Sequence, residues 1–407
     1  MHSTDLIPHL FRSEYSKIVS VLCKRFGLEF REAAEDIASE TFLTAAQTWA
    51  LGGIPDEPVA WLYAVAKNKA ANALKRERLF ATHIAPELRH GADDTYELDL
   101  SEQNIVDSQL QMMFAVCDPS IPVEAQIGLS LRILCGFSID EIASAFLSNK
   151  ETINKRLFRA KEKLREAKVE LEFPSPEELD ARLGTVLRTI YLLFNEGYYS
   201  QHSDAVVRKD LCIEAMRLCM MLIEYPATDT PQANALMALM CFHTSRFDAR
   251  IGAEGELILY GDQDDSLWNE ALISKGAYFM SCAARGDTIS KYHLEASIAY
   301  WSTCKEDTPE KWENVLGLYD RLLALEHSPI VALNRTYAVS KVHGTQMAIE
   351  EAQRLALMNN RFYHALLGEL YAGIDNQQAT FHFDRALQIA RGESERALLR
   401  SRIERLS

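Results

Sequence analysis

The spacing of apolar residues is the feature of this sequence that most restricts its fold. In nearly every long segment the apolar side chains recur at intervals of three and four, as in the series Ile153, Leu157, Ala160 and Leu164. That interval matches an α-helical turn of about 3.6 residues, whereas a strand with one buried face alternates at every second residue. No segment alternates convincingly. The sequence therefore predicts an all-α fold.

Length and composition are those of a globular protein from a reducing compartment. The 407 residues are enough for several domains, and 48% of them are hydrophobic. The eight cysteines are scattered without a CxxC pair, which favours buried thiols over a zinc site. No apolar run approaches the ~18 residues of a membrane helix, and the first residues do not have the pattern of a signal peptide. We therefore predict a cytoplasmic protein that contacts no membrane and needs no cofactor or metal.

Two basic segments stand out in a chain whose formal net charge is −15. Residues 61–80 hold five basic and one acidic side chain, and residues 146–168 hold eight basic and three acidic ones. Between them, residues 81–107 hold seven acidic side chains and one arginine, with little periodicity, which is typical of a tether. The total charge argues against indiscriminate nucleic-acid binding, so any such contact must be local.

The second basic segment has the pattern of a helix-turn-helix. Ser138 and Glu141 form a capping box that starts a short helix, and a short turn leads to a basic helix with one apolar stripe. In that motif the second helix enters the DNA major groove. The alternative interpretation is a solvated outer face. The preceding capped helix and the short turn make that alternative weaker.

The first basic segment follows an acidic helix, "FREAAEDIASETFLTAAQTW", and the turn "GGIPDEP". One stripe of the basic helix carries Trp61, Val65, Asn68, Asn72 and Lys75. Aromatic, amide and basic groups on one face suit opened or single-stranded DNA, in which bases stack on rings. A buried Trp61 beside a solvated helix end is the alternative.

Taken in order, these segments resemble a bacterial RNA polymerase sigma factor of the extracytoplasmic-function type. The resemblance covers about residues 5–172 and is carried by "AEDIASETFLTAAQTW", "WLYAVAKNKAANALKRERL" and "LSLRILCGFSIDEIASAFLSNKETINKRLFRAKEKLR". Further on, "RTIYLLFNEGYYS" and "HSPIVALNRTYAVSKVHG" resemble the C-terminal extension of a subgroup with a tetratricopeptide-like domain. There, "LNRTYA" returns 34 residues later as "LGELYA".

The resemblance implies four parts. Residues 1–82 would bind core polymerase and melt the promoter, and residues 83–107 would form an acidic linker. Residues 108–173 would form the helix-turn-helix domain, and residues 174–407 a regulatory domain of helical hairpins. That last domain would bind a protein partner or fold back on the DNA-binding modules. The implied function is promoter-specific transcription initiation, which is not an enzymatic activity.

The resemblance also implies site residues. Core RNA polymerase would be contacted by Asp36, Glu40, Phe42, Leu43 and Trp49. The melted promoter element would be held by Trp61, Lys67, Asn68, Asn72, Lys75 and Arg76. The upstream duplex element would be read by Lys150, Thr152, Lys155, Arg156 and Arg159. The chain departs from the family pattern at Leu147, Ser148 and Asn72, so turn geometry and promoter preference do not carry over there.

Three other functions are weaker. A stand-alone helix-turn-helix regulator with a helical sensor domain explains residues 138–168 and the repeats, but gives no role to the two earlier helices. An enzyme could use the group Glu196, Tyr198, His202 and Asp204, which has no nucleophile pattern. A cation loop at residues 261–270 does not have the calcium-loop spacing. A pure scaffold would require both basic helices to be solvated faces.

Overall fold

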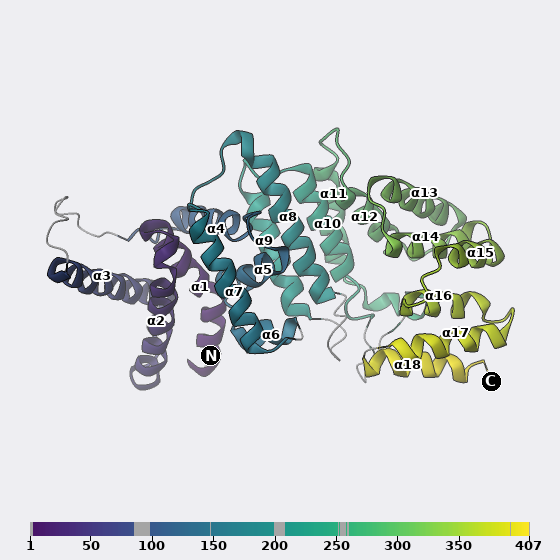
Figure 1. Ribbon diagram of the computed structural model, residues 1–407, viewed down its shortest axis with the longest axis horizontal. Coiled ribbons are helices and arrows are strands. Elements are labelled where there is room, and N and C mark those ends of the chain that lie inside the picture. Colours follow the sequence, from purple (N-terminus) through teal and green to yellow (C-terminus); the bar gives the residue numbers. More distant parts are fainter. Residues whose placement is uncertain are drawn as a thin grey trace. The chain divides into compact units, whose positions relative to one another are not determined.

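The computed structural model describes residues 3–84, 98–146, 148–198, 208–250, 252, 258, 260–390 and 392–406. These residues form helices and connecting turns without a β-strand, which confirms the all-α prediction (Figure 1). The chain divides into two compact units, Met1–Thr189 and Ile190–Ser407. Helix α8 (Pro176–Tyr198) spans the division. In the described part of the chain, no helix has both the length and the apolar character needed to cross a membrane.

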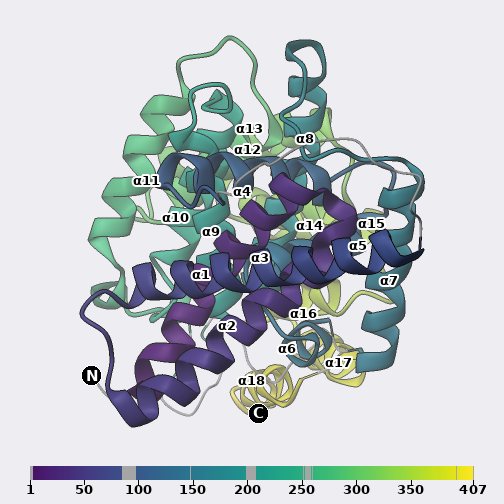
Figure 2. The same cartoon turned by 90° about the vertical axis from the view of Figure 1, so that its left-hand side faces the viewer.

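The first unit is built around its N-terminal helix. Its elements are α1 (Ser3–Phe26), η1 (Leu28–Phe30), α2 (Arg31–Gly52), α3 (Pro58–Ile84), α4 (Glu102–Val116), α5 (Val123–Leu129), η2 (Ser130–Leu134), α6 (Ile139–Ala145) and α7 (Lys150–Glu166). Helix α1 packs against α2, α3, α4 and η2, and Figure 2 shows the side of the unit where α1, α2 and α3 lie. Ile18, Val19 and Leu22 are fully buried there. One helix therefore supports both of the expected modules.

The expected acidic linker coincides only partly with described residues. Residues 85–97 lie outside them. Leu98 and Leu100 are buried, and the Ser101 hydroxyl caps α4 by accepting a hydrogen bond from Asn104 N–H at 3.4 Å. Residues 102–107, at the end of the expected linker, therefore belong to α4.

The second unit begins with a layer of helices around α10. Its first elements are α9 (Lys209–Glu224), α10 (Pro231–Thr244), η3 (Tyr260–Asp262), η4 (Asp265–Leu267), α11 (Glu270–Ala283) and α12 (Lys291–Trp301). Helices α9, α11 and α12 all pack on α10, which is buried on nearly every side. Gly276 of α11 leaves room for the Phe242 ring of α10, because a Cβ there would lie 2.6 Å from that ring.

The second unit continues as a row of helices, which we call the hairpin array: α13 (Pro309–Leu325), α14 (Pro329–Val342), α15 (Thr345–Leu355), α16 (Arg361–Tyr371), α17 (Asn376–Ile389) and α18 (Glu393–Glu404). Consecutive helices of the array pack on one another. The repeated "LNRTYA" and "LGELYA" lie in α14 and α16. Ala379, Phe383 and Ala386 form a buried stripe on α17. The array is thus a succession of helices, each packed on the next.

Candidate nucleic-acid interface

Helices α6 and α7 begin where the sequence predicted. Glu141 N–H donates to the Ser138 hydroxyl at 3.2 Å, and Ser138 N–H donates to the Glu141 carboxylate at 2.8 Å, so the capping box is complete. Asn149 caps α7 by accepting from Thr152 N–H at 2.7 Å. The predicted inner stripe of α7 is buried along its whole length, at Ile153, Leu157, Ala160 and Leu164. The remaining faces of α7 are therefore free to carry charge.

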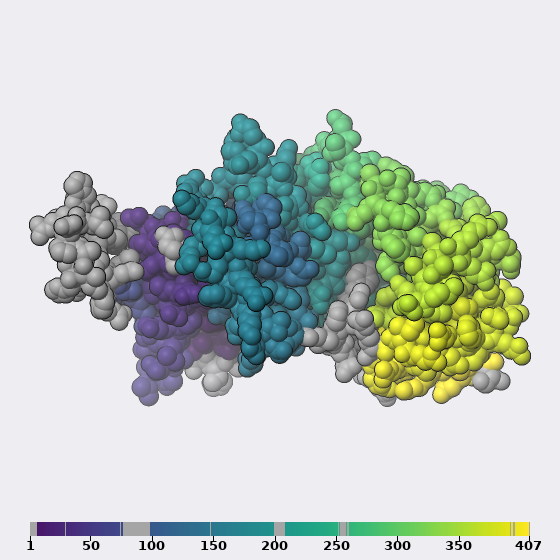
Figure 3. Space-filling view, in the orientation of Figure 1, coloured from purple at the N-terminus to yellow at the C-terminus, as the bar shows by residue number. Residues whose placement is uncertain are grey.

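The expected base-reading residues lie on those faces. Lys150, Thr152, Lys155 and Arg159 are exposed, and α7 is uncovered on the face seen in Figure 3. Arg156 is half-buried, with its guanidinium 5.8 Å from the centre of the Phe146 ring. The ammonium groups at the start of the helix pair with carboxylates on the surface, Lys150 with Asp140 and Lys155 with Glu151, both at 2.6 Å. Such exposed ion pairs contribute little to stability, so the two ammonium groups can exchange them for contacts with DNA phosphates.

Phe158 is a residue of α7 that the sequence analysis did not single out. Its ring is 60% exposed, in the middle of the basic surface. Its position off the stripe of Leu157 and Ala160 is the signal that could have identified it. An apolar side chain on a groove-reading helix can contact the methyl group of thymine.

On helix α2 the expected contact residues separate into two groups. Asp36, Glu40 and Leu43 form an exposed stripe, and Leu43 is 58% exposed. Phe42 and Trp49 are only 5% and 3% exposed. These two side chains therefore hold α2 in place and present little surface to a partner, which differs from the expected contact role.

Aromatic contacts explain why Phe42 and Trp49 are buried. The Phe42 ring meets the Phe11 ring of α1 edge-on at 5.0 Å between centroids. Trp49 meets Trp61 of α3 edge-on at 5.3 Å. Trp61 is half-buried as a result, with part of its ring still accessible. Both expected roles of Trp61, as core and as stacking surface, are thus physically compatible.

Helix α3 presents the polar part of the expected stripe. Lys67, Asn68, Asn72 and Lys75 are exposed, whereas the Arg76 side chain lies outside the described residues. The helix is fixed to α1 by Tyr63, whose hydroxyl donates to the Glu14 carboxylate at 2.6 Å. Burial, together with that carboxylate, raises the pKa of Tyr63 above its usual range, so the phenol stays a donor.

A charged cluster connects α2 to the helix-turn-helix segment. The Glu35 carboxylate lies 3.4 Å from Arg31 Nε, 3.6 Å from Arg132 of η2 and 4.0 Å from Lys161 of α7. Burial lowers the pKa of both Arg31 and Lys161, while Glu35 favours their charged forms. Burial and Glu35 also raise the pKa of nearby Tyr15 to about 12. One carboxylate thus holds cations from three elements of the first unit.

Of the four residues that an enzyme could use, Glu196 and Tyr198 lie in the described part of the chain. Tyr198 is buried against Phe194 and under the Arg250 guanidinium, which lies 3.9 Å from its ring centre. His202 and Asp204 lie outside the described residues. Within the described ranges, no group of three or more histidine, cysteine, aspartate or glutamate side chains could hold a metal ion.

Comparison with known proteins supplies the family. Residues 10–80 match the family model of sigma-70 region 2. Residues 182–284 match a family of unknown function, DUF6596. An uncharacterized protein of Rhizobium meliloti (strain 1021) is 33% identical over 386 residues, which cover 92% of this chain and 90% of that protein. The chain belongs to the sigma-70 family.

The matched residues correspond to α1, α2 and α3, so the acidic and basic helices of the first unit belong to region 2. This sigma factor carries a C-terminal extension, as the sequence predicted. Sigma-70 factors are transcription initiation factors, not enzymes, and their region 2 binds core RNA polymerase and promoter DNA. No solved structure matches the whole chain or a part of it.

Proposed function

We propose that this sigma factor is of the extracytoplasmic-function type, that α6 and α7 form a promoter-reading helix-turn-helix, and that the C-terminal unit regulates it. The observation that carries the proposal is α7, whose apolar stripe is fully buried while Lys155 and Arg159 face outward. A helix built only for solubility would not need a capped helix and a tight turn directly before it. Because transcription initiation takes place in the cytoplasm, this is where we place the protein.

The length of α7 restricts which residues can read bases. Its 17 residues span about 26 Å at ~1.5 Å per residue, whereas the major groove is only about 12 Å wide. The first half of the helix, through Arg159, would meet base edges. Lys163 and Arg165, further along, would meet phosphate. Specificity would therefore come from Lys150, Thr152, Lys155, Arg156 and Arg159.

Helices α2 and α3 would supply the other two contacts. The exposed stripe of α2 at Asp36, Glu40 and Leu43 would dock on core polymerase, with Phe42 and Trp49 supporting it from the core. The melted strand would be held by Trp61, Lys67, Asn68, Asn72, Lys75 and Arg76. Bases of a melted element stack on aromatic rings or enter a neighbouring pocket after flipping out.

The charge distribution of the chain is consistent with these separate roles of polymerase and DNA contacts. A net charge of −15 opposes binding to arbitrary DNA, so the basic surfaces of α3 and α7 act only when polymerase adds its own affinity. The acidic linker would pass toward the polymerase cleft in place of nucleic acid. The hairpin array, similar in layout to tetratricopeptide repeats, would bind a protein partner or the chain's own DNA-binding modules.

Run-off transcription with purified core polymerase tests the proposal. The templates are genomic fragments that include the promoter of the protein's own gene, and the proteins are the full chain and a truncation after Thr189. Promoter-specific transcripts that require core polymerase are expected from the full chain. The truncation then shows whether the C-terminal unit helps or restrains initiation. Arg159→Ala in the full chain should lose transcripts, while exposed Glu170→Ala should keep them.

A stand-alone regulator is the second candidate, because α6 and α7 alone would suffice for it. It predicts that the full chain shifts specific duplex DNA without polymerase and yields no transcripts. That pair of results would overturn the proposed roles of the α2 stripe and of α3.

A further inference from the structure

One loop of the C-terminal unit contacts the hairpin array and the turn before it through an aromatic residue and two carboxylates. We call residues 260–265 the loop tip. The backbone on either side is anchored to the turn after α10, because Ile258 N–H donates to Arg250 O at 2.9 Å and Asn269 N–H donates to Ser245 O at 2.8 Å. The chain therefore holds the tip at both ends without using the side chains of the tip.

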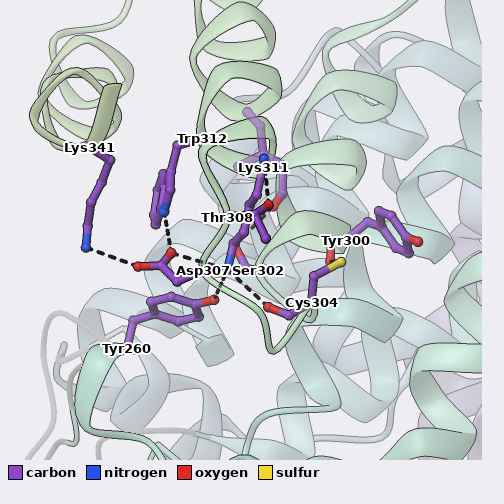
Figure 4. A network of polar contacts seen from close by, with 10 residues as sticks. Tyr260, Tyr300, Ser302, Cys304, Asp307, Thr308, Lys311, Trp312 and Lys341 are labelled. Carbon is purple, nitrogen blue, oxygen red and sulfur yellow. Dashed lines mark hydrogen bonds and ion pairs between the residues drawn. The ribbon is translucent and has the colours of Figure 1, made fainter. Parts of the chain in front are cut away.

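The aromatic contact is made to a buried lysine. Lys311, at the start of α13, is only 2% exposed, and its ammonium donates to the Tyr260 hydroxyl and to Cys304 O, both at 3.0 Å (Figure 4). The Arg246 guanidinium also lies 5.3 Å from the centre of the Tyr260 ring. A buried ammonium must be hydrogen-bonded, and the Tyr260 hydroxyl supplies one of its two acceptors at 3.0 Å.

Lys311 is held in place independently of the loop. The Asp307 carboxylate lies 3.8 Å from the Lys311 ammonium, accepts a hydrogen bond from the Trp312 indole and accepts another from Lys341 of α14 at 3.3 Å (Figure 4). Asp307 thus positions the ammonium, and Trp312 and Lys341 hold Asp307 in place. All three residues belong to the array or to the turn before it. The acceptor site is preorganised, whether or not Tyr260 fills it.

The carboxylates of the tip meet two further cations. Asp262 accepts from Arg402 of α18 at 2.6 Å, and Arg402 is also 3.0 Å from Glu369 of α16. Asp265 lies 3.8 Å from the Lys305 ammonium. We call Lys305, Lys311 and Arg402 the recognition face. An aromatic residue, an acid two positions later and an acid three positions after that each find a cation on this face.

The acidic contacts of the tip are weak enough to exchange. Asp265 and Lys305 are both about half exposed, at 47% and 51%, whereas the exposed Asp262, at 50%, pairs with Arg402, at 18%. The Asp265–Lys305 pair therefore contributes little to stability, and the Asp262 carboxylate is open to solvent and can be exchanged for another carboxylate. Trp268, directly after η4, is buried and anchors the loop base instead. The tip is thus a replaceable occupant of a preformed basic face.

We propose that the recognition face binds an acidic segment of a protein partner, one in which a tyrosine precedes an aspartate by two residues, and that the loop tip occupies the face in the free protein. Charge complementarity carries the assignment, because the chain's own acidic segment already satisfies all three cations. The inference rests on the proposed role of the C-terminal unit in protein interaction. It adds the chemistry of the partner and a built-in competitor for the same site.

A peptide-binding experiment tests it without DNA or polymerase. The probe is a fluorescein-labelled peptide with the sequence of residues 258–267, and the protein is the full chain with Tyr260→Ala, Asp262→Ala and Asp265→Ala. Fluorescence anisotropy should show at least tenfold tighter binding to this variant than to the unaltered chain. Adding Arg402→Gln, or using a peptide with asparagine at position 262, should remove the gain. A scrambled peptide should not bind.

Two results would overturn the inference. The first is a triple variant that keeps the helical content and melting temperature of the unaltered chain yet binds the peptide no better. The second is loss of the fold both in the triple variant and in the milder Asp262→Asn, Asp265→Asn variant, which would make the tip a structural part. Promoter-specific transcripts without peptide binding would contradict only this inference and would leave the proposed sigma function intact. Peptide binding without transcripts would instead sink the proposed sigma mechanism and leave the recognition face standing.

Discussion

Helices α7 and α2 were both expected to present contact residues, but the two helices differ in how exposed those residues are. On α7 the residues expected to face a partner are exposed or half-buried. On α2, two of the five expected contacts, Phe42 and Trp49, are buried. The apolar residues of α7 are mostly confined to one stripe, whereas α2 has apolar residues on more than one face. When a helix has one apolar face and one polar face, the sequence predicts which side chains are exposed. Residue type alone does not predict this.

The largest expected effect separates two neighbours on α2. Phe42→Ala should lower the free energy of unfolding by about 3–5 kcal/mol, because it empties a buried site that is packed against Phe11. Leu43→Ala removes an exposed side chain and should change stability by less than ~0.5 kcal/mol. Urea unfolding followed by circular dichroism measures both.

The affinity for core polymerase should be affected in the opposite order: among folded variants, Leu43→Ala should lose more affinity than Phe42→Ala. At a temperature where both variants are folded, Leu43→Ala should weaken polymerase binding by about tenfold, or about 1.4 kcal/mol, which is less than the loss of an interface hot spot. Equal, unchanged affinity in both variants would remove α2 from the proposed docking surface. The comparison of the two helices would then rest on α7 alone.

A second neighbouring pair tests α7. Leu157→Ala should destabilise the first unit by about 2–5 kcal/mol, because Leu157 is buried in tight contact with the backbone at Gly128. Phe158→Ala should leave stability within ~0.5 kcal/mol and act instead on promoter affinity. If Phe158→Ala were the more destabilising change, the assignment of the two faces would be wrong.

Promoter binding should distinguish the two ends of α7. Arg159→Ala should cost about 1–3 kcal/mol on the specific promoter and relax the preference at one base pair. Arg165 lies near the end of the helix and pairs with Glu162 at 2.5 Å. Arg165→Ala should weaken binding to all DNA sequences alike, and the slope of log affinity against log salt concentration should fall by about one. Holoenzyme titrations on specific and mutated promoters at several salt concentrations measure both changes.

Local pattern was enough to predict the helices, the start of α6 and the buried stripe of α7, because each depends on residues within one or two turns. It was also enough for the stripe of Ala379, Phe383 and Ala386. It was not enough for contacts between distant segments. The Glu35 cluster with Arg132 and Lys161, and the bond between Asp262 and Arg402, depend on how helices pack. No short-range periodicity encodes such pairs.

The expected linker ends at residue 107, whereas α4 already begins at Glu102, and a local signal in the sequence could have shown this. Ser101 and Asn104 stand in a capping relation before a helix, yet the acidic composition of residues 81–107 outweighed that signal. Composition describes a segment as a whole, whereas a cap fixes one residue.

The smallest expected effect tests the capping box of α6. Ser138→Ala removes the hydroxyl that accepts from Glu141 N–H and should destabilise the first unit by about 1 kcal/mol. Ser144→Ala, at an exposed position inside the same helix, is the matched control and should be neutral or slightly stabilising, because alanine is the better helix former. Thermal unfolding of both variants gives the comparison. The difference should also appear in promoter binding, since α6 sets the position from which α7 starts. An unchanged melting temperature and unchanged promoter affinity in Ser138→Ala would mean that the turn, and not the cap, positions α7.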